Sequence, residues 1–166
     1  TVATSRLIEI GISRRHQRAL ADRGVARVPQ PDARWMVLVH VCVLIGAVLE
    51  VWLLKRPFLP AVAAPMIVLF VLSTLLRWWA IRALEQHWNL QVMDSLALGI
   101  VTGGPFRWIR HPNYLAVFLE YLAIPLIHGA WLTASVGALA HFVVLRARIG
   151  AEEHMLMAYP AYRRTM

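Results

Sequence analysis

The sequence predicts an all-α integral membrane protein with about four to five transmembrane helices, the last two paired in a C-terminal helical hairpin. Three observations support this fold class. Of the 166 residues, 59% are hydrophobic and 16% are charged, a composition that is unusual for a soluble domain of this size. Several apolar stretches approach the ~20 residues that cross a bilayer as a helix. The basic residues gather at the ends of these stretches.

The first 34 residues predict an amphipathic helix, or the end of a helix that starts upstream of Thr1. Between residues 5 and 21, apolar side chains alternate with four arginines, and Gly24 follows as a stop signal. Because the sequence begins with Thr rather than Met and has no signal-peptide pattern, we expect it to start after processing or truncation.

The first full span is predicted over residues 36–54, where the polar residues are His40 and Glu50. At about 1.5 Å per residue this stretch crosses a hydrocarbon core of about 30 Å. His40 and Glu50 are ten residues apart and so about 80° from each other around such a helix, and we do not expect them to act as a pair. Glu50 is near the end of the span, where a carboxylate either extends to the membrane surface or pairs with an arginine.

Residues 58–76 predict a second, returning span of nineteen uncharged residues, in which Pro65 is tolerated because neighbouring helices satisfy the freed backbone groups. The following connection, 77–113, is rich in tryptophan, which favours the headgroup level of a membrane. We expect this connection to form an interfacial helix and then a loop on the cytosolic side. The glycines and proline of residues 102–105 are a turn signal.

Two further spans are predicted over residues 114–127 and 130–149, joined tightly at His128-Gly129, and a cytosolic tail follows over 150–166. The whole chain then forms one membrane domain. We expect His128 and His141 to be hydrogen-bonded packing residues rather than metal ligands. With Cys42 as the one cysteine, no metal site is predicted.

The distribution of basic residues predicts which side of the membrane each end faces. Fifteen of the 17 Lys and Arg residues fall on the side that holds the N-terminal segment, the 77–113 connection and the tail. The positive-inside rule makes that side cytosolic. The net charge is +8, and the basic residues that produce it are separated by apolar and aromatic residues. This pattern suits contact with membrane lipids rather than nucleic acid.

The segment 103–114 concentrates polar side chains beside a span, where charge is costly unless it serves a ligand or a partner. Its donors could hold a carboxylate, and a proline in the first helical turn leaves backbone N–H groups facing a ligand. The candidate binding residues are Arg107, Arg110, His111, Pro112, Asn113 and Tyr114. The alternative is that the two arginines only anchor the membrane end and that His111-Pro112 only starts a helix.

A second polar cluster follows the last span. Glu152 and Glu153 are expected just beyond the membrane exit, and His154, Tyr159, Tyr162 and Arg163 come after them. The carboxylates could meet the arginines of the first cluster across the hairpin. The alternative is a solvated acidic pair that offsets Arg146 and Arg148.

Together these residues resemble the isoprenylcysteine carboxyl methyltransferases, and bacterial members most of all. The resemblance is carried by Gly-Pro-Phe-Arg-Trp-Ile-Arg-His-Pro-Asn-Tyr, followed after a hairpin by Arg-Ile-x-x-Glu-Glu and a Tyr-x-x-Tyr-Arg tail. These motifs cover about residues 103–164. The N-terminal Arg-Leu-Ile-Glu-Ile-x-x-Ser-Arg-Arg is similar to a bacterial subgroup regarded as methyltransferases of lipid-like or polyketide products.

The resemblance implies an integral-membrane enzyme of the bacterial inner membrane that uses S-adenosylmethionine and releases S-adenosylhomocysteine. The cofactor would be enclosed between the last two spans and the tail, with the active site facing the cytosol. His111, Pro112 and Tyr114 match the cofactor motif of the family, and Glu152 and Glu153 match its acidic pair. The further residues assigned to cofactor binding are Asn113, Arg107 and Tyr162.

The acceptor is predicted to be lipophilic, an isoprenoid, lipid or polyketide-like molecule that enters from the bilayer and carries a carboxylate or hydroxyl group. Arg163 or Arg110 would hold an acidic acceptor, and Glu152 or His154 would serve as base for a less acidic hydroxyl. Three alternatives remain: a membrane reductase using a nicotinamide cofactor, a phospholipid N-methyltransferase, and a non-enzymatic membrane subunit. An acidic pair beside a nicotinamide cofactor's phosphate is electrostatically unfavourable, which disfavours the first.

Overall fold

The computed structural model describes residues 33–84 and 103–157, and within these ranges every regular element is helical. The elements are α2 (Ala33–Leu53), α3 (Pro60–Leu84), the short 3-10 helix η3 (Gly104–Arg107), α4 (Pro112–Ile127) and α5 (Trp131–Met157). Three stretches, Arg34–Leu53, Pro60–Leu84 and Trp131–His154, are long and apolar enough to cross a membrane, and α4 is a shorter apolar helix. The prediction of an all-α membrane protein is confirmed.

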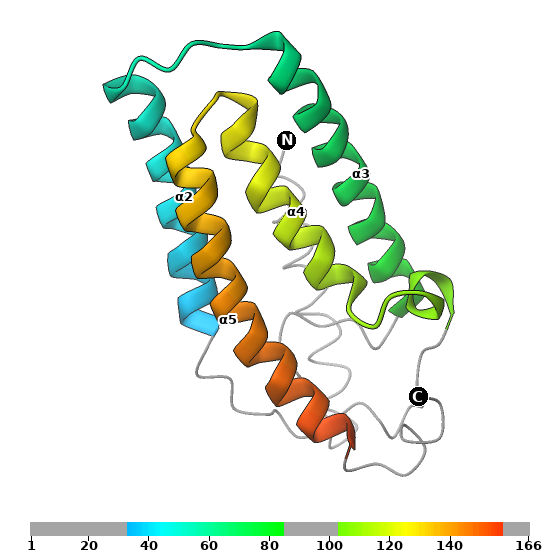
Figure 1. Ribbon diagram of the computed structural model, residues 1–166. Coiled ribbons are helices and arrows are strands. Elements are labelled where there is room, and N and C mark those ends of the chain that lie inside the picture. Colours follow the sequence, from blue (N-terminus) through cyan, green and yellow to red (C-terminus); the bar gives the residue numbers. More distant parts are fainter. Residues whose placement is uncertain (1–32, 85–102, 158–166) are drawn as a thin grey trace.

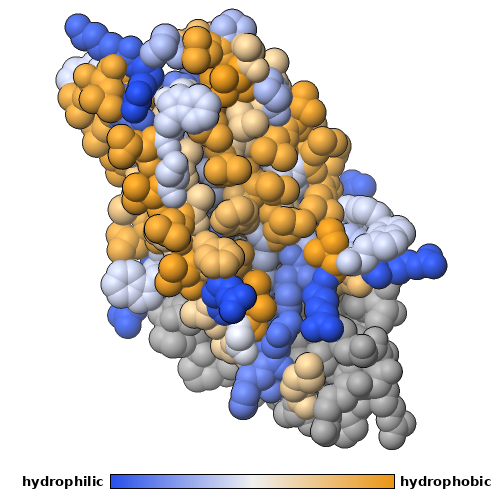
Figure 2. Space-filling model, viewed as in Figure 1, coloured by the Kyte–Doolittle hydropathy of each residue, from blue (hydrophilic) through white to orange (hydrophobic). Residues whose placement is uncertain are grey.

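The helices run up and down as one bundle (Figure 1). α4 packs against both α3 and α5, while α2 packs against α5 and touches α4. Consecutive helices alternate in direction, so the starts of α2 and α4 share one end of the bundle with the last turns of α3 and α5. Hydrophobic side chains cover most of the visible face of the helices, as expected for a surface in contact with lipid (Figure 2).

The tight hairpin between α4 and α5 is present as predicted. Gly129 has a φ of +72°, a conformation that residues with a side chain rarely adopt. Its N–H donates to Leu126 O at 3.1 Å, and Ala130 N donates to Pro125 O at 3.0 Å. These bonds close the chain reversal over residues 128–130, between the end of α4 and the start of α5.

Two helices continue beyond the predicted ends of their spans. α3 runs on from Leu76 to Leu84, and α5 runs on from residue 149 to Met157. The continuation of α3 was missed because Arg77 suggested an interface, whereas its guanidinium is buried and faces Glu120, with Nη1 and Oε2 3.6 Å apart. The predicted helix over residues 5–21, residues 85–102 of the connection and residues 158–166 of the tail lie outside the described residues.

Small buried residues let the helices approach closely. Ala80, Ala116, Ala123 and Ala134 are almost completely buried, and Gly137 of α5 lies against Val43 of α2. In a membrane the hydrophobic effect does not drive helices together, so their association depends on close van der Waals packing. Small residues allow this packing and are therefore enriched at helix interfaces.

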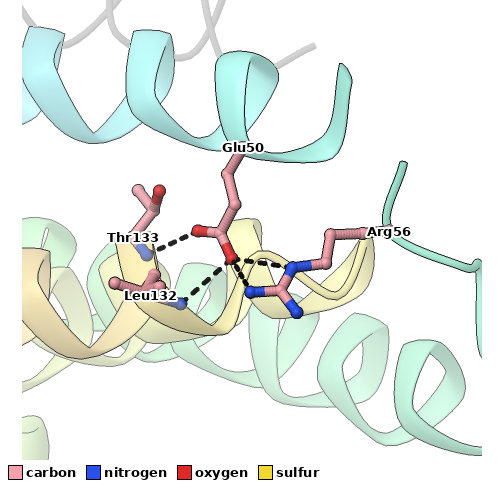
Figure 3. A network of polar contacts seen from close by, with 4 residues as sticks. All are labelled: Glu50, Arg56, Leu132 and Thr133. Atoms are coloured by element: carbon pink, nitrogen blue, oxygen red, sulfur yellow. Dashed lines mark hydrogen bonds and ion pairs between the residues drawn. The ribbon is translucent and has the colours of Figure 1, made fainter. Parts of the chain in front are cut away.

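One end of the bundle is closed by a polar network around Glu50, which we call the cap end (Glu50, Arg56, Leu132 and Thr133; Figure 3). Glu50 of α2 accepts hydrogen bonds from the backbone N–H groups of Leu132 at 3.1 Å and Thr133 at 2.7 Å, in the first turn of α5. Arg56 adds a charged hydrogen bond to Oε1, with Nη2 2.9 Å away. Of the two roles expected for Glu50, pairing with an arginine is the one observed, and its capping of another helix is an additional role.

The interior holds a second polar group, made by His40, Tyr121 and His141. His40 Nδ1 is 2.7 Å from the Tyr121 hydroxyl, so His40 pairs with α4 rather than with Glu50. The His141 ring lies on Tyr121, with ring centres 4.2 Å apart, and is completely buried. Among the described residues its nitrogens have no hydrogen-bond partner, so His141 packs by stacking and not by the hydrogen bonding that we expected.

Candidate functional site

The opposite end of the bundle, which we call the site end, is built on the segment that enters α4. Gly103 precedes η3, and Pro105 O then accepts hydrogen bonds from the N–H groups of Trp108 at 3.1 Å and Ile109 at 3.0 Å. These turns fix the chain just before His111, the N-cap residue of α4. The His111 side chain makes no capping hydrogen bond, so it does not occupy the N–H groups at the start of α4.

Glu153 of α5 meets the residues just before α4. Its Oε1 lies 3.3 Å from His111 Nε2 and 3.8 Å from Arg110 Nη1. His111 is largely buried, whereas the Arg110 side chain is 53% exposed and that of Glu153 is 34% exposed. Glu153 therefore joins α5 to the entry of α4 through long contacts that remain open to solvent.

Glu152 is held by a shorter chain of hydrogen bonds. The Tyr114 hydroxyl donates to Glu152 Oε2 at 2.6 Å and accepts from Arg148 Nε at 2.9 Å. Arg148 Nη1 also lies 3.1 Å from the sulfur of Met36, which brings the start of α2 into the same group. The His111 and Tyr114 rings stack with centres 5.5 Å apart, so the environments of the two carboxylates are contiguous.

The two polar clusters identified in the sequence thus lie together. The residues through which they meet are Arg110, His111, Tyr114, Glu152 and Glu153. Pro112 is buried in the first turn of α4. The remaining predicted residues are placed less centrally: the guanidinium of Arg107 lies over the Trp108 ring, 5.8 Å from its centre, and His154 is exposed. Tyr159, Tyr162 and Arg163 are outside the described residues.

Asn113, in the first turn of α4, carries an acceptor that is unsatisfied among the described residues. Its Oδ1 is buried and, within the ranges that the structure describes, has no hydrogen-bond partner. A buried amide oxygen left in this state costs about 1–3 kcal/mol, which a ligand with an N–H or O–H donor would recover. Asn113 and the first turn of α4 therefore favour a ligand that carries both a donor and an anionic group.

Sequence reasoning named Arg148 only as a charge that the acidic pair could offset, and it did not place Arg148 or Met36 at the site. The sequence did contain a signal for Arg148, because it precedes Glu152 by four residues and so shares its face of α5. No pattern could have indicated Met36, since its sulfur reaches Arg148 from a distant helix. Among the described residues no group of three or more His, Cys, Asp or Glu side chains could hold a metal ion.

The chain is similar to a known protein family and to proteins of two bacteria. The model of the isoprenylcysteine carboxyl methyltransferase (ICMT) family matches residues 66–158, more than half of the chain, from within α3 to the end of α5. The uncharacterized protein YpbQ of Bacillus subtilis is 28% identical over 155 residues, which cover 93% of this chain and 91% of that protein. An uncharacterized protein of Haemophilus influenzae is 26% identical over 149 residues, 89% of this chain and 86% of the relative. No solved structure matches the chain.

Proposed function

The chain belongs to the isoprenylcysteine carboxyl methyltransferase family of membrane methyltransferases, and from this premise we propose that it transfers a methyl group from S-adenosylmethionine to a lipophilic acceptor. The observation that carries the proposal is the pairing of the two motifs across the α4–α5 hairpin, through Tyr114 with Glu152 and through His111 with Glu153. Both halves of this contact lie inside the region that the family model matches.

The donor groups of S-adenosylmethionine fit the residues at the site end. Its ammonium and ribose hydroxyls require acceptors, which Glu152, Glu153 and Asn113 Oδ1, without a partner among the described residues, would provide. Its carboxylate suits the first turn of α4, where the positive end of the helix dipole is not occupied by the His111 side chain. When bound, S-adenosylmethionine would supply an electrophilic methyl group on sulfur.

In this proposal the protein residues orient the reactants and exclude water. Tyr114 is fixed between Arg148 and Glu152, so Glu152 presents its second oxygen in one direction. Methyl transfer requires the nucleophile, the methyl carbon and the sulfur to lie in line, so fixed binding groups matter more than a strong base. The packing of α4 against α5 would keep bulk water from one side of such a site.

We further propose that the acceptor is lipophilic, carries a carboxylate or hydroxyl, and enters from the bilayer. Arg110 is the described cation with a half-exposed side chain beside the acidic pair, and it would hold an anionic acceptor, as would Arg163. For a hydroxyl acceptor, Glu152 or His154 would take the proton. The excess of basic residues at the site end supports a cytosolic orientation in a bacterial inner membrane.

The test is calorimetric titration of the detergent-purified protein with S-adenosylhomocysteine. We expect saturable binding that Glu152→Gln weakens at least about ten-fold, because a charged hydrogen-bond partner is lost. The matched control is Arg146→Gln, which changes an exposed residue of the same helix and should bind normally. Absence of binding to the folded protein, or binding of NADPH alone, would contradict the proposal, and methylation of phosphatidylethanolamine would redirect it to a phospholipid N-methyltransferase.

A further inference from the structure

A cluster of exposed aromatic and basic side chains lies beside the site, where η3 rests on the last turns of α3. Trp108 is 70% exposed and Trp79 is 47% exposed, and their ring centres are 6.0 Å apart. The Arg107 guanidinium lies 5.8 Å from the centre of the Trp108 ring, and the exposed Arg82 is three residues after Trp79 on the same helix. We call these four residues the Trp–Arg patch.

The Trp–Arg patch is held together by a close approach of the Gly104 backbone to side chains of α3. Gly104 of η3 has a φ of +61°, and a Cβ at this position would lie 2.8 Å from Ala83 Cβ and 3.3 Å from Trp79 Nε1. A glycine is therefore needed for η3 to lie on α3. This contact sets Trp108 beside Trp79, so both rings emerge from one surface.

The described segments that form the Trp–Arg patch contribute basic but no acidic side chains. Neither α3 nor residues 103–111 contain an aspartate or glutamate. The nearby Arg110 is different, because it faces Glu153. The patch thus combines two guanidinium groups with two indole rings, which prefer the level of the lipid headgroups.

We propose that the Trp–Arg patch binds the phosphate of an anionic phospholipid in the leaflet at the site end, with the indole rings at the boundary between headgroup and acyl chain. Cations near a membrane surface each favour anionic lipid by about 1 kcal/mol, or roughly five-fold. The zwitterionic headgroup of phosphatidylcholine carries its own cation and gains less from the two arginines. This inference does not rest on the proposed methyl transfer.

The cap end shows why tryptophan alone is not the basis of the proposal. Trp52 and Trp131 are also exposed there, at 74% and 45%. Of the two cations that the structure describes near these tryptophans, however, Arg56 is bound to Glu50, which leaves Lys55. A preference for anionic lipid is therefore expected at the site end and not at the cap end.

The experiment is quenching of tryptophan fluorescence in nanodiscs of phosphatidylcholine that contain brominated phosphatidylglycerol or brominated phosphatidylcholine at equal fractions. The signal of Trp108 is obtained as the difference between the wild type and Trp108→Phe. We expect Trp108 to be quenched more by the brominated phosphatidylglycerol, and Arg107→Gln to reduce this preference roughly five-fold.

The matched control is Lys55→Gln, which removes one exposed charge near an exposed tryptophan at the cap end and should leave the preference of Trp108 unchanged. Equal quenching by the two lipids, or an equal loss in Lys55→Gln, would overturn the proposal. Abolition of the preference by millimolar inorganic phosphate would also overturn it, because the patch would then bind free phosphate rather than a lipid.

Discussion

The cap end and the site end both join a carboxylate of one helix to the start of another, but they satisfy it differently. Glu50 is 7% exposed and receives two backbone hydrogen bonds at the first turn of α5 together with a charged pair with Arg56. At the site end, Glu153 is 34% exposed and its contacts are 3.3 and 3.8 Å long. A buried carboxylate whose hydrogen bonds are all made within the protein stabilises the fold, whereas a partly exposed carboxylate can still accept hydrogen bonds from a ligand.

The first turns of α5 and α4 also differ in whether a side chain binds their backbone N–H groups. The first N–H groups of α5 are taken by Glu50, whereas the His111 side chain leaves those of α4 without a side-chain cap. An N-terminus with its N–H groups satisfied has no capacity for a further anion. The start of α5 at the cap end therefore serves stability, whereas the start of α4 at the site end can serve binding.

The largest expected effect is on folding, at the cap end. Glu50→Gln keeps one acceptor oxygen but removes the charge that Arg56 and the α5 dipole both require. We expect the free energy of unfolding in detergent to fall by about 2 kcal/mol, because hydrogen bonds to charged groups are lost. Binding of S-adenosylhomocysteine by the protein that remains folded should be unchanged, and a specific loss of binding would break the proposed division.

A smaller effect is expected on binding, at the site end. Tyr114→Phe keeps the ring beside His111 but removes the hydroxyl that donates to Glu152 at 2.6 Å. Without this donor and its link to Arg148, Glu152 is free to rotate, and we expect affinity for S-adenosylhomocysteine to fall about ten-fold. Calorimetry measures the loss, and circular dichroism checks the helix content. Unchanged affinity would mean that Tyr114 does not position the acidic pair.

Sequence alone predicted the fold and the contact between the two motifs because both depend on local patterns. Apolar runs locate the helices, and the short hairpin forces α4 and α5 to run side by side. The cap of α5 by Glu50 could not be specified, because nothing in the sequence indicates which distant helix start a carboxylate will reach. Arg77 was placed at the membrane surface because nothing in the sequence indicated its buried partner Glu120, which is more than 40 residues away.

The smallest effect on stability is expected for Glu153→Gln, which makes at the site end the same Glu-to-Gln change as Glu50→Gln at the cap end. Glu153→Gln removes a charge whose partner Arg110 is half exposed, and such pairs are screened by solvent and ions. We expect the free energy of unfolding to change by less than about 0.5 kcal/mol. Affinity for S-adenosylhomocysteine should fall several-fold, and added salt should reduce that difference, because the lost interaction is electrostatic. Denaturant unfolding and calorimetry at two salt concentrations separate the two quantities. If Glu153→Gln destabilised the protein as much as Glu50→Gln, the acidic pair would be a second structural cap, and the open contacts of Glu153 would no longer support a binding role.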